Sequence, residues 1–255
     1  MTEKYETKPG VRLPKTEDPR PKRFYETVAV EPEGESWAVR LDGRPVRTPA
    51  KTPLTAPTKA LAELIAEEWA SQGERIDAPT MPTTRIGFVA LDRMPLALED
   101  TAAEIVKYAS TDLLCFRAPE PADLVAAQAA AWDPLLKWAE TELGAHFAPA
   151  TGVLQVQQDP MALQAVHARV ADLDTWRMTA TAHATAVCGS AILGLALLEA
   201  EIDGGQAFAL STIDEHFQAS QWGEDSEAAE RLALLKTELL AVDALLRALD
   251  AGSDA

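Results

Sequence analysis

The sequence predicts an α+β protein, in which a small N-terminal domain with an antiparallel sheet plus helices is followed by an all-helical domain. Between residues 24 and 48, apolar and polar side chains alternate with the period of two that a half-buried strand requires. From Thr58 onward the apolar residues recur at helical spacing, and residues 178–198 carry no charged side chain. The sheet is therefore expected only near the start of the chain, with a helix bundle after it.

Three short strands are expected, at residues 24–30, 37–41 and 46–48. A Pro-Glu-Gly-Glu turn separates the first two. Asp42-Gly43 follows the second strand, and both residues tolerate the positive φ that a tight hairpin turn demands. The prolines between residues 45 and 57 cannot donate to a strand ladder, so the sheet is expected to be small.

The first helix is expected to begin after Pro57 and to carry Leu61, Ile65 and Trp69 on one face. Because it shares this apolar face, Trp69 is expected to belong to the core. The segment from Ile76 to Arg93 contains two prolines among its apolar residues, and its sequence is compatible with a last strand or with the start of a short helix.

Helices are expected throughout the rest of the chain. A helical pattern resumes at about residues 98–109, and the prolines at positions 119 and 121 indicate a domain boundary. An apolar stripe between residues 124 and 143 is interrupted at Asp133-Pro134, where the chain either kinks or ends one helix and caps another. Further helices are expected at about residues 160–170, 175–201, 210–217 and 226–249.

These patterns divide the chain into three parts. Residues 1–22 are polar and rich in proline and are expected to form a disordered tail. Residues 23–118 are expected to form the sheet-containing domain, and residues 119–255 the all-helical domain. The first 22 residues lack both the apolar stretch of a signal peptide and the acid-poor pattern of a transit peptide, so a cytoplasmic location is expected.

The uncharged stretch from Met178 to Leu198 is long enough to cross a bilayer. However, it is dominated by Ala, Thr and Gly, and it is flanked by Arg177 and two glutamates rather than by basic or aromatic anchors. A helix at the centre of a bundle is also apolar all round. We therefore expect a buried bundle helix and no membrane insertion.

The charge of the chain is unevenly distributed. The whole sequence has a formal net charge of -17, and residues 58–255 alone carry 12 basic and 31 acidic side chains, a balance of -19. A surface of this sign repels nucleic-acid phosphates and anionic lipid headgroups. The sequence therefore argues against a nucleic acid as partner and favours a basic or neutral protein.

The sequence offers little local support for catalysis. Cys115 and Cys188 are too few for a disulfide framework and lack metal-ligand spacing. The four histidines do not pair with one another or with cysteine at helical spacing; they are His146, His167, His183 and His216. Neither a phosphate-binding glycine loop nor a nucleophile elbow is present. We expect no catalytic residue, no metal and no cofactor.

One alternative is a small-molecule enzyme with a cleft of acidic and basic residues between the two domains. Its first candidates are Arg85, Arg93, Arg117 and Asp112, although ion pairing explains these residues equally well. A deep polar pocket in which ionisable groups converge would favour this alternative. A broad apolar or acidic surface without such a pocket would favour a binding protein.

Four residues around one expected helix end are candidates for partner contact: Glu215, Gln218, Trp222 and Glu224. The tryptophan precedes Gly223, which is suited to a helix C-terminus. Trp222 is compatible with packing on the bundle. Alternatively, an amphipathic aromatic side chain beside carboxylates forms an interaction hot spot.

Seven motifs carry a family resemblance, and they are RFYETVAV (Arg23–Val30), LDGRPVRTPA (Leu41–Ala50), EEWASQ (Glu67–Gln72), MPTTR (Met81–Arg85), TDLLCFRA (Thr111–Ala118), WDPLLKW (Trp132–Trp138) and FQASQWGED (Phe217–Asp225). In this order they resemble the assembly chaperones for the alpha subunit of the F-type ATP synthase catalytic head. The match covers about residues 22–235.

The resemblance implies a C-terminal bundle of the orthogonal type and no catalytic activity. It also implies that the partner is the unassembled alpha subunit, whose beta-facing surface is shielded until assembly. Relatives in mitochondria carry a targeting segment, so the expectation here is a bacterial cytoplasmic protein. The candidate contact residues lie in or beside the last motif, and a monomer is expected.

Overall fold

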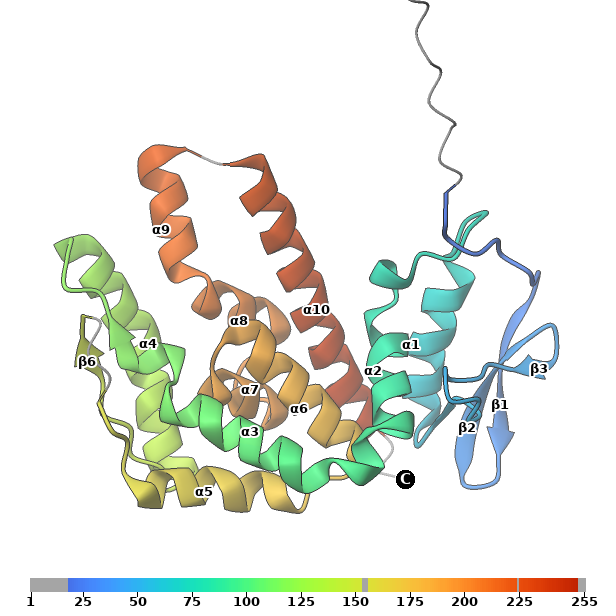
Figure 1. Ribbon diagram of the computed structural model, residues 1–255, viewed down its shortest axis with the longest axis horizontal. Coiled ribbons are helices and arrows are strands. Elements are labelled where there is room, and N and C mark those ends of the chain that lie inside the picture. Colours follow the sequence, from blue (N-terminus) through green and yellow to red (C-terminus); the bar gives the residue numbers. More distant parts are fainter. Residues whose placement is uncertain (1–17, 153–155, 224, 252–255) are drawn as a thin grey trace, which may run out of the picture.

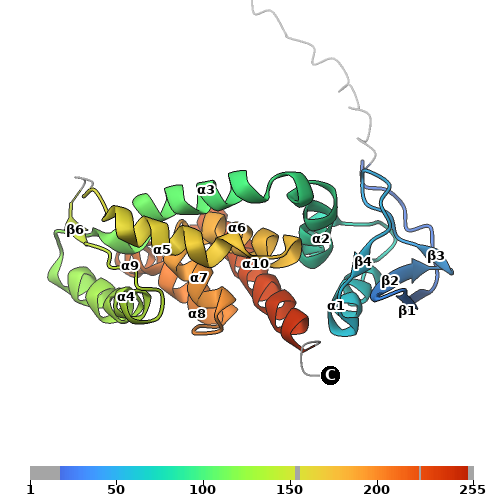
Figure 2. The same ribbon diagram turned by 90° about the horizontal axis from the view of Figure 1, so that it is seen from below.

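The computed structural model describes residues 18–152, 156–223 and 225–251. A small sheet lies at one end of the molecule, and helices make up most of the rest (Figure 1). Seen from below, the sheet lies beside α1 (Lys59–Ala70), and α4 (Ala122–Glu142) lies at the opposite end (Figure 2). The predicted α+β architecture is confirmed.

The central strand of the sheet is β2 (Ser36–Leu41). It pairs antiparallel with β1 (Val28–Glu33) along one edge, and with the two-residue strands β3 (Arg44–Pro45) and β4 (Thr55–Ala56) along the other. A separate two-stranded pairing joins β5 (Phe116–Arg117) to β6 (Ala150–Thr151) beside the helices. The antiparallel sheet is therefore small and confined to the start of the chain, as expected.

The third strand lies earlier than the expected residues 46–48. Asp42 and Gly43 form the expected turn with positive φ. After this turn Val46 still donates to the Val39 carbonyl at 2.9 Å. Thr48 N then donates to the Thr52 carbonyl at 2.9 Å, so the backbone pairs with the residues that follow it rather than with β2. The Thr48 hydroxyl donates to Asp92 Oδ1 of α2 (Pro82–Asp92) at 2.6 Å.

The segment from Ile76 to Arg93 contains a helix, which settles the question that its sequence leaves open. After the short 3₁₀ helix η1 (Ala78–Thr80), α2 begins at Pro82. Both Glu68 carboxylate oxygens accept from backbone N–H groups of its first turn, Thr83 and Thr84, at 2.7 Å each. The cap of α2 therefore comes from α1, where no local sequence pattern reveals it.

Trp69 belongs to the core, as expected, because only 8% of it is exposed. Its backbone carbonyl accepts from the Tyr25 hydroxyl at 2.6 Å, and the two rings meet edge to face at 5.7 Å. At the other end of α1, Thr58 caps the helix by accepting from Leu61 N. The Thr58 hydroxyl also donates to the carbonyl of Ala248 in α10 (Ser226–Asp250).

The chain continues through η2 (Met94–Leu96), α3 (Leu98–Ser110) and η3 (Leu113–Cys115). The Asp133-Pro134 pair then lies inside one continuous helix, α4. Buried Trp132 and Leu135 flank the proline and pack into the core, which offsets the hydrogen bond that proline removes. Next, α5 (Pro160–Ala171) begins where expected, with Asp159 accepting from Met161 N.

The long helix expected over residues 175–201 is two helices, α6 (Thr175–Cys188) and α7 (Ala191–Leu198). Gly189 has a φ of 66° and ends α6, and the Ser190 hydroxyl caps α7. Gly194 lets the two helices pack closely, because a Cβ there would lie 2.4 Å from Thr185 Oγ1. Among the described residues, no helix has the length and apolarity that crossing a bilayer requires.

Gly204 and Gly205 are the first two residues of α8 (Gly204–Ser211). The segment expected as one helix at residues 210–217 is divided at Thr212, after which α9 (Ile213–Trp222) begins. Together, α9 and α10 form two arms that rise from the bundle (Figure 1). Buried apolar residues from both predicted domains form one continuous core. The division at residues 118 and 119 stays a prediction.

Candidate partner-binding cleft

A cleft of about 490 Å³ lies at the base of the two arms. On its walls α9 presents Glu215 and Gln218, and α10 presents Arg231 and Leu235. The floor comes from η3, α4 and the end of α6, and its residues include Leu113, Trp132, Val187 and Cys188. The cleft therefore combines charged and amide walls with a mainly apolar floor.

Hydrogen bonds from distant elements hold the α9 wall in place. The Trp132 indole donates to the Leu210 carbonyl at 2.9 Å and fixes α4 against α8. Buried Gln128 donates to Asp214 Oδ1 at 2.7 Å, and its own amide oxygen accepts from Ala118 N. The first turn of α9 is thus attached to α4 and to the loop before it.

Across the cleft, Arg231 Nη2 lies 3.4 Å from Glu215 Oε1, and the Arg231 side chain is exposed while that of Glu215 is partly exposed. An exposed pair of this length contributes little stability. The two charges therefore remain available to a partner that enters between the arms.

A second cavity, of about 450 Å³, lies on the side of α10 that faces α2. Its walls are mainly apolar and include Ile86 and Val89 of α2 and Met94 of η2. At one end Glu238 of α10 pairs with Arg85 and, at 2.8 Å, with His183 Nε2 of α6. Burial acts to raise the pKa of Glu238, but hydrogen bonds from these two partners outweigh it and hold the pKa below its usual value.

The family model for the ATP12 chaperone protein matches residues 22–140. The crystal structure of Atp12 from Paracoccus denitrificans is 43% identical, with a TM-score of 0.82, and the match covers 90% of this chain and 98% of that one. The chain belongs to the ATP12 chaperone family. The motifs in the sequence therefore identify the family correctly.

Two further relatives agree with this family. The Atu1473 protein of Agrobacterium tumefaciens is 40% identical, with a TM-score of 0.84, over 90% of this chain and 86% of that one. The mitochondrial protein atp12 of Schizosaccharomyces pombe is 24% identical over 238 residues, which span 89% of this chain and 81% of that protein. The protein is therefore an ATP synthase assembly chaperone by family.

The structure brings two of the four expected contact residues into the cleft. Glu215 and Gln218 line it one turn apart on α9. Trp222 is the last residue of the same helix and is 80% exposed, so it does not pack on the bundle. Glu224 lies outside the described residues. The contact role of all four stays a prediction.

The sequence reasoning missed Arg231 and Leu235 as cleft residues. Both lie on α10, and Asp225 sets the start of this helix by accepting from Ala228 N at 2.9 Å. The helical pattern of residues 226–249 and the turn at Gly223 together indicate that two helices run side by side. That arrangement is the signal that places one face of α10 opposite Glu215.

The four residues considered for an enzyme do not converge among the described elements. Arg85 pairs with Glu238, whereas Arg117 Nη2 pairs with Asp133 at 2.8 Å. Asp112 is fully buried and accepts from the Ser190 hydroxyl and from Ile192 N at the start of α7. Arg93 lies at the C-terminal end of α2. Arg85, Arg117 and Asp112 therefore form ion pairs and hydrogen bonds with different partners rather than facing one common site.

The two cysteines are buried and poorly suited to nucleophilic chemistry. Burial, reinforced by the nearby Asp112 carboxylate, raises the pKa of Cys115 to about 12. Burial likewise raises the pKa of Cys188 to about 12. Since the thiolate is the reactive species, both side chains are inert at neutral pH.

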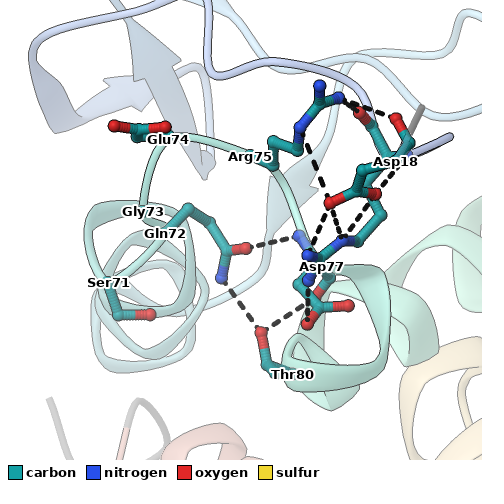
Figure 3. Close-up of a pocket in the computed structure, with 9 residues that line it drawn as sticks. Asp18, Ser71, Gln72, Gly73, Glu74, Arg75, Asp77 and Thr80 are labelled. Carbon is teal, nitrogen blue, oxygen red and sulfur yellow. Dashed lines mark hydrogen bonds and ion pairs between the residues drawn. The ribbon is translucent and has the colours of Figure 1, made fainter. Parts of the chain in front are cut away.

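A polar pocket of about 460 Å³ lies where residues 18–23 cross the loop after α1 (Figure 3). Arg20 pairs with Asp18 at 2.7 Å and with Asp77 at 3.0 Å. Arg75 donates to the Asp18 carbonyl at 2.9 Å, and Gln72 Oε1 accepts from Asp77 N at 2.7 Å. These groups already satisfy one another, so the network fastens the start of the described chain to the loop after α1.

Proposed function

We propose that this protein binds the unassembled alpha subunit of the F-type ATP synthase and shields its beta-facing surface until the neighbouring subunit takes its place. The observation that carries the proposal is membership of the ATP12 chaperone family. The cleft between α9 and α10 supports it, because charged walls around a base that includes Leu113 and Val187 suit a protein surface.

Covering a surface requires no chemistry. A ring subunit without its neighbour exposes the apolar face that it later buries, and such faces drive aggregation. A chaperone needs only a temporary substitute for that neighbour. We infer that the protein has no catalytic activity, and the separate contacts of Arg85, Arg117 and Asp112 support this inference.

Charge supports the choice of partner and the speed of its capture. The acidic balance of residues 58–255 favours a partner whose exposed face is basic. Electrostatic steering of this kind raises the association rate and weakens with ionic strength. The association rate with purified alpha subunit should therefore fall from low to high salt, and a rate that does not change would remove steering from the proposal.

The decisive experiment is capture of purified alpha subunit by the immobilised protein. We expect Glu215→Lys and Glu224→Lys to weaken capture several-fold, since each reverses a charge at the proposed contact surface. The exposed residue Glu99, at the start of α3, gives the matched control Glu99→Lys. It makes the same change of charge away from the cleft and should leave capture intact.

Two results would contradict parts of this proposal. If the unaltered protein captured no alpha subunit, the partner would be wrong. If it captured the alpha subunit and the Glu215→Lys and Glu224→Lys variants did so equally well, the partner would stand and the contact residues would be wrong. The cytoplasmic location and the monomeric state expected from the sequence stay predictions.

A further inference from the structure

The outward face of α6 forms an uncharged track along the surface of the bundle. Ala182, His183, Ala186 and Val187 are the residues on this face that are not fully buried. Their spacing of three and four residues places them on one side of the helix. None of the four is Asp, Glu, Lys or Arg, and charged side chains such as Glu238 and Glu215 stand beside this face on the neighbouring helices.

The two cavities lie one after the other on this track. Ala182 and His183 line the cavity beside α2, and Ala186 and Val187 line the cleft between the arms. The same order holds on α10, where Glu238 lines the first cavity and Leu235 lines the second. Since one helical turn rises about 5.4 Å, the cavities are separated by roughly one turn of each helix.

Apolar surface continues along the rim of this track. Leu234 precedes Glu238 on α10 by one turn, on the same side of the helix, and is 58% exposed. Val89 of α2 lines the first cavity and is also partly exposed. At the polar end of that cavity, Arg85 Nε is buried and has no hydrogen-bond partner among the described residues.

The walls of the track determine what can bind there. They are formed by α2, α6, α9 and α10, whose backbone groups are hydrogen-bonded within each helix except at its ends. An extended segment would find no free strand edge and would leave its own N–H and C=O groups unpaired. A helix satisfies its own backbone and presents only side chains.

We propose that the track over α6, from the cavity beside α2 to the cleft between α9 and α10, is the docking groove for one amphipathic helix of the client. Apolar side chains at positions i, i+3 or i+4, and i+7 of that helix match the spacing of the two cavities. Basic side chains on its flank face Glu215 and the acidic arms. The identity of the client, though not the groove, rests on the function proposed above.

Substitutions in the floor of the groove test this inference. Ala182→Arg and Ala186→Arg each place a long charged side chain where the apolar face of the helix would lie. Ala168 is exposed on α5, outside both cavities, and Ala168→Arg makes the same change of charge. The melting temperature and far-ultraviolet circular dichroism of each variant establish that it is folded.

We expect each groove variant to bind purified alpha subunit at least tenfold more weakly than the Ala168→Arg control. If the unaltered protein binds the alpha subunit and the folded groove variants bind as tightly as the control, the groove is overturned and the proposed function survives. If the unaltered protein binds no alpha subunit, the client assignment fails instead.

Crosslinking identifies the occupant directly. Cys115 and Cys188 are buried and unreactive, so a benzophenone attached to Ala186→Cys labels the groove selectively. With alpha subunit as the probe, we expect crosslinks to one segment with apolar residues at i, i+3 or i+4, and i+7. Crosslinks to a segment of alternating strand pattern, or to a second copy of this chain, would overturn the inference.

Discussion

The Ser190 hydroxyl donates a hydrogen bond to Asp112 inside the core, with 2.7 Å between Ser190 Oγ and Asp112 Oδ1, although 78 residues separate the two along the chain. The Asp112 carboxylate also accepts from Ile192 N and Leu114 N at 3.0 Å each. One buried carboxylate thus joins η3, at the floor of the cleft, to the junction of α6 and α7. In doing so it fixes the end of the helix that forms the proposed groove.

This carboxylate predicts a pH dependence of stability. Burial raises the pKa of Asp112 to about 6, although its hydrogen bonds act in the opposite direction. A carboxyl whose pKa is raised by folding stabilises the protein fully below its unfolded pKa, and this contribution is lost as the pH rises through about 6. The Asp112 contribution to the free energy of unfolding should therefore decrease from pH 4 to pH 7, by about 3 kcal/mol at most.

Comparison with Asp112→Asn isolates this effect from the other carboxyls, because asparagine does not titrate. Urea unfolding at pH 5 and pH 7 measures the stability of both proteins. The free energy of unfolding of the unaltered protein minus that of the variant should be larger at pH 5 than at pH 7. Parallel changes of stability with pH in the two proteins would show that Asp112 does not titrate in this range.

Substitution by arginine should lower the stability of the protein strongly at Trp69 and hardly at all at Trp222. Trp69→Arg places a charge without a partner in the core and removes the ring packed on Tyr25, which should cost about 3–5 kcal/mol. Trp222→Arg changes an exposed side chain and should alter stability by at most about 0.5 kcal/mol. Thermal melting followed by circular dichroism makes the comparison, and a native-like melt for Trp69→Arg would refute the core assignment.

Gly194 should tolerate no side chain without a loss of stability. A Cβ at this position would lie 2.4 Å from Thr185 Oγ1 and 3.2 Å from the Thr181 carbonyl, so Gly194→Ala should destabilise the protein by about 1–3 kcal/mol. Gly73→Ala is the control, because nothing lies within 4 Å of a Cβ there. Equal unfolding midpoints for the two variants would mean that α6 and α7 are not closely packed at Gly194.

Glu68 should contribute to stability as the cap of α2. Glu68→Ala leaves the N–H groups of Thr83 and Thr84 without their acceptor and should cost about 1–2 kcal/mol. Its neighbour Glu67 is exposed, and Glu67→Ala should change stability by a few tenths of a kcal/mol. Chemical denaturation of both variants provides the test, and similar losses would argue against the capping role.

Local patterns predict the elements whose signals are local. Asp42-Gly43 predicts its turn, and the helix expected from residue 160 starts at Pro160 with Asp159 as its cap. The strand pattern at residues 46–48 does not predict its strand correctly, because after Val46 the backbone pairs with the residues that follow it, as in the bond from Thr48 N to the Thr52 carbonyl, rather than with β2.

The break between α6 and α7 shows why composition alone misleads. An uncharged run from residue 178 to residue 198 indicates one long helix, and Gly189 inside it looks like one more small residue. The helix ends there because Gly189 adopts a φ of 66° and Ser190 caps α7, and both of these signals are local. The hydrogen bonds that the Ser190 hydroxyl and Ile192 N donate to Asp112 hold the junction from a distant element, so no window of sequence reveals them.

The cleft was predictable only in part. The position of Glu215 and Gln218 on one helix follows from their spacing, whereas the sequence left open whether Trp222 packs on the bundle or is exposed. Arg231 and the floor residue Trp132 join the site through the packing of α4, α9 and α10, which is a tertiary property. Local sequence signals therefore found one wall of the cleft.

The hydrogen bond from Thr58 to the Ala248 carbonyl joins the first helix to the end of the last one. A ribosome releases α1 and α2 long before it reaches Ala248. The apolar faces of α1 and α2 that rest on α10 therefore stay uncovered until α10 itself has been synthesised. Throughout that interval the nascent chaperone exposes apolar surface and is itself vulnerable to aggregation.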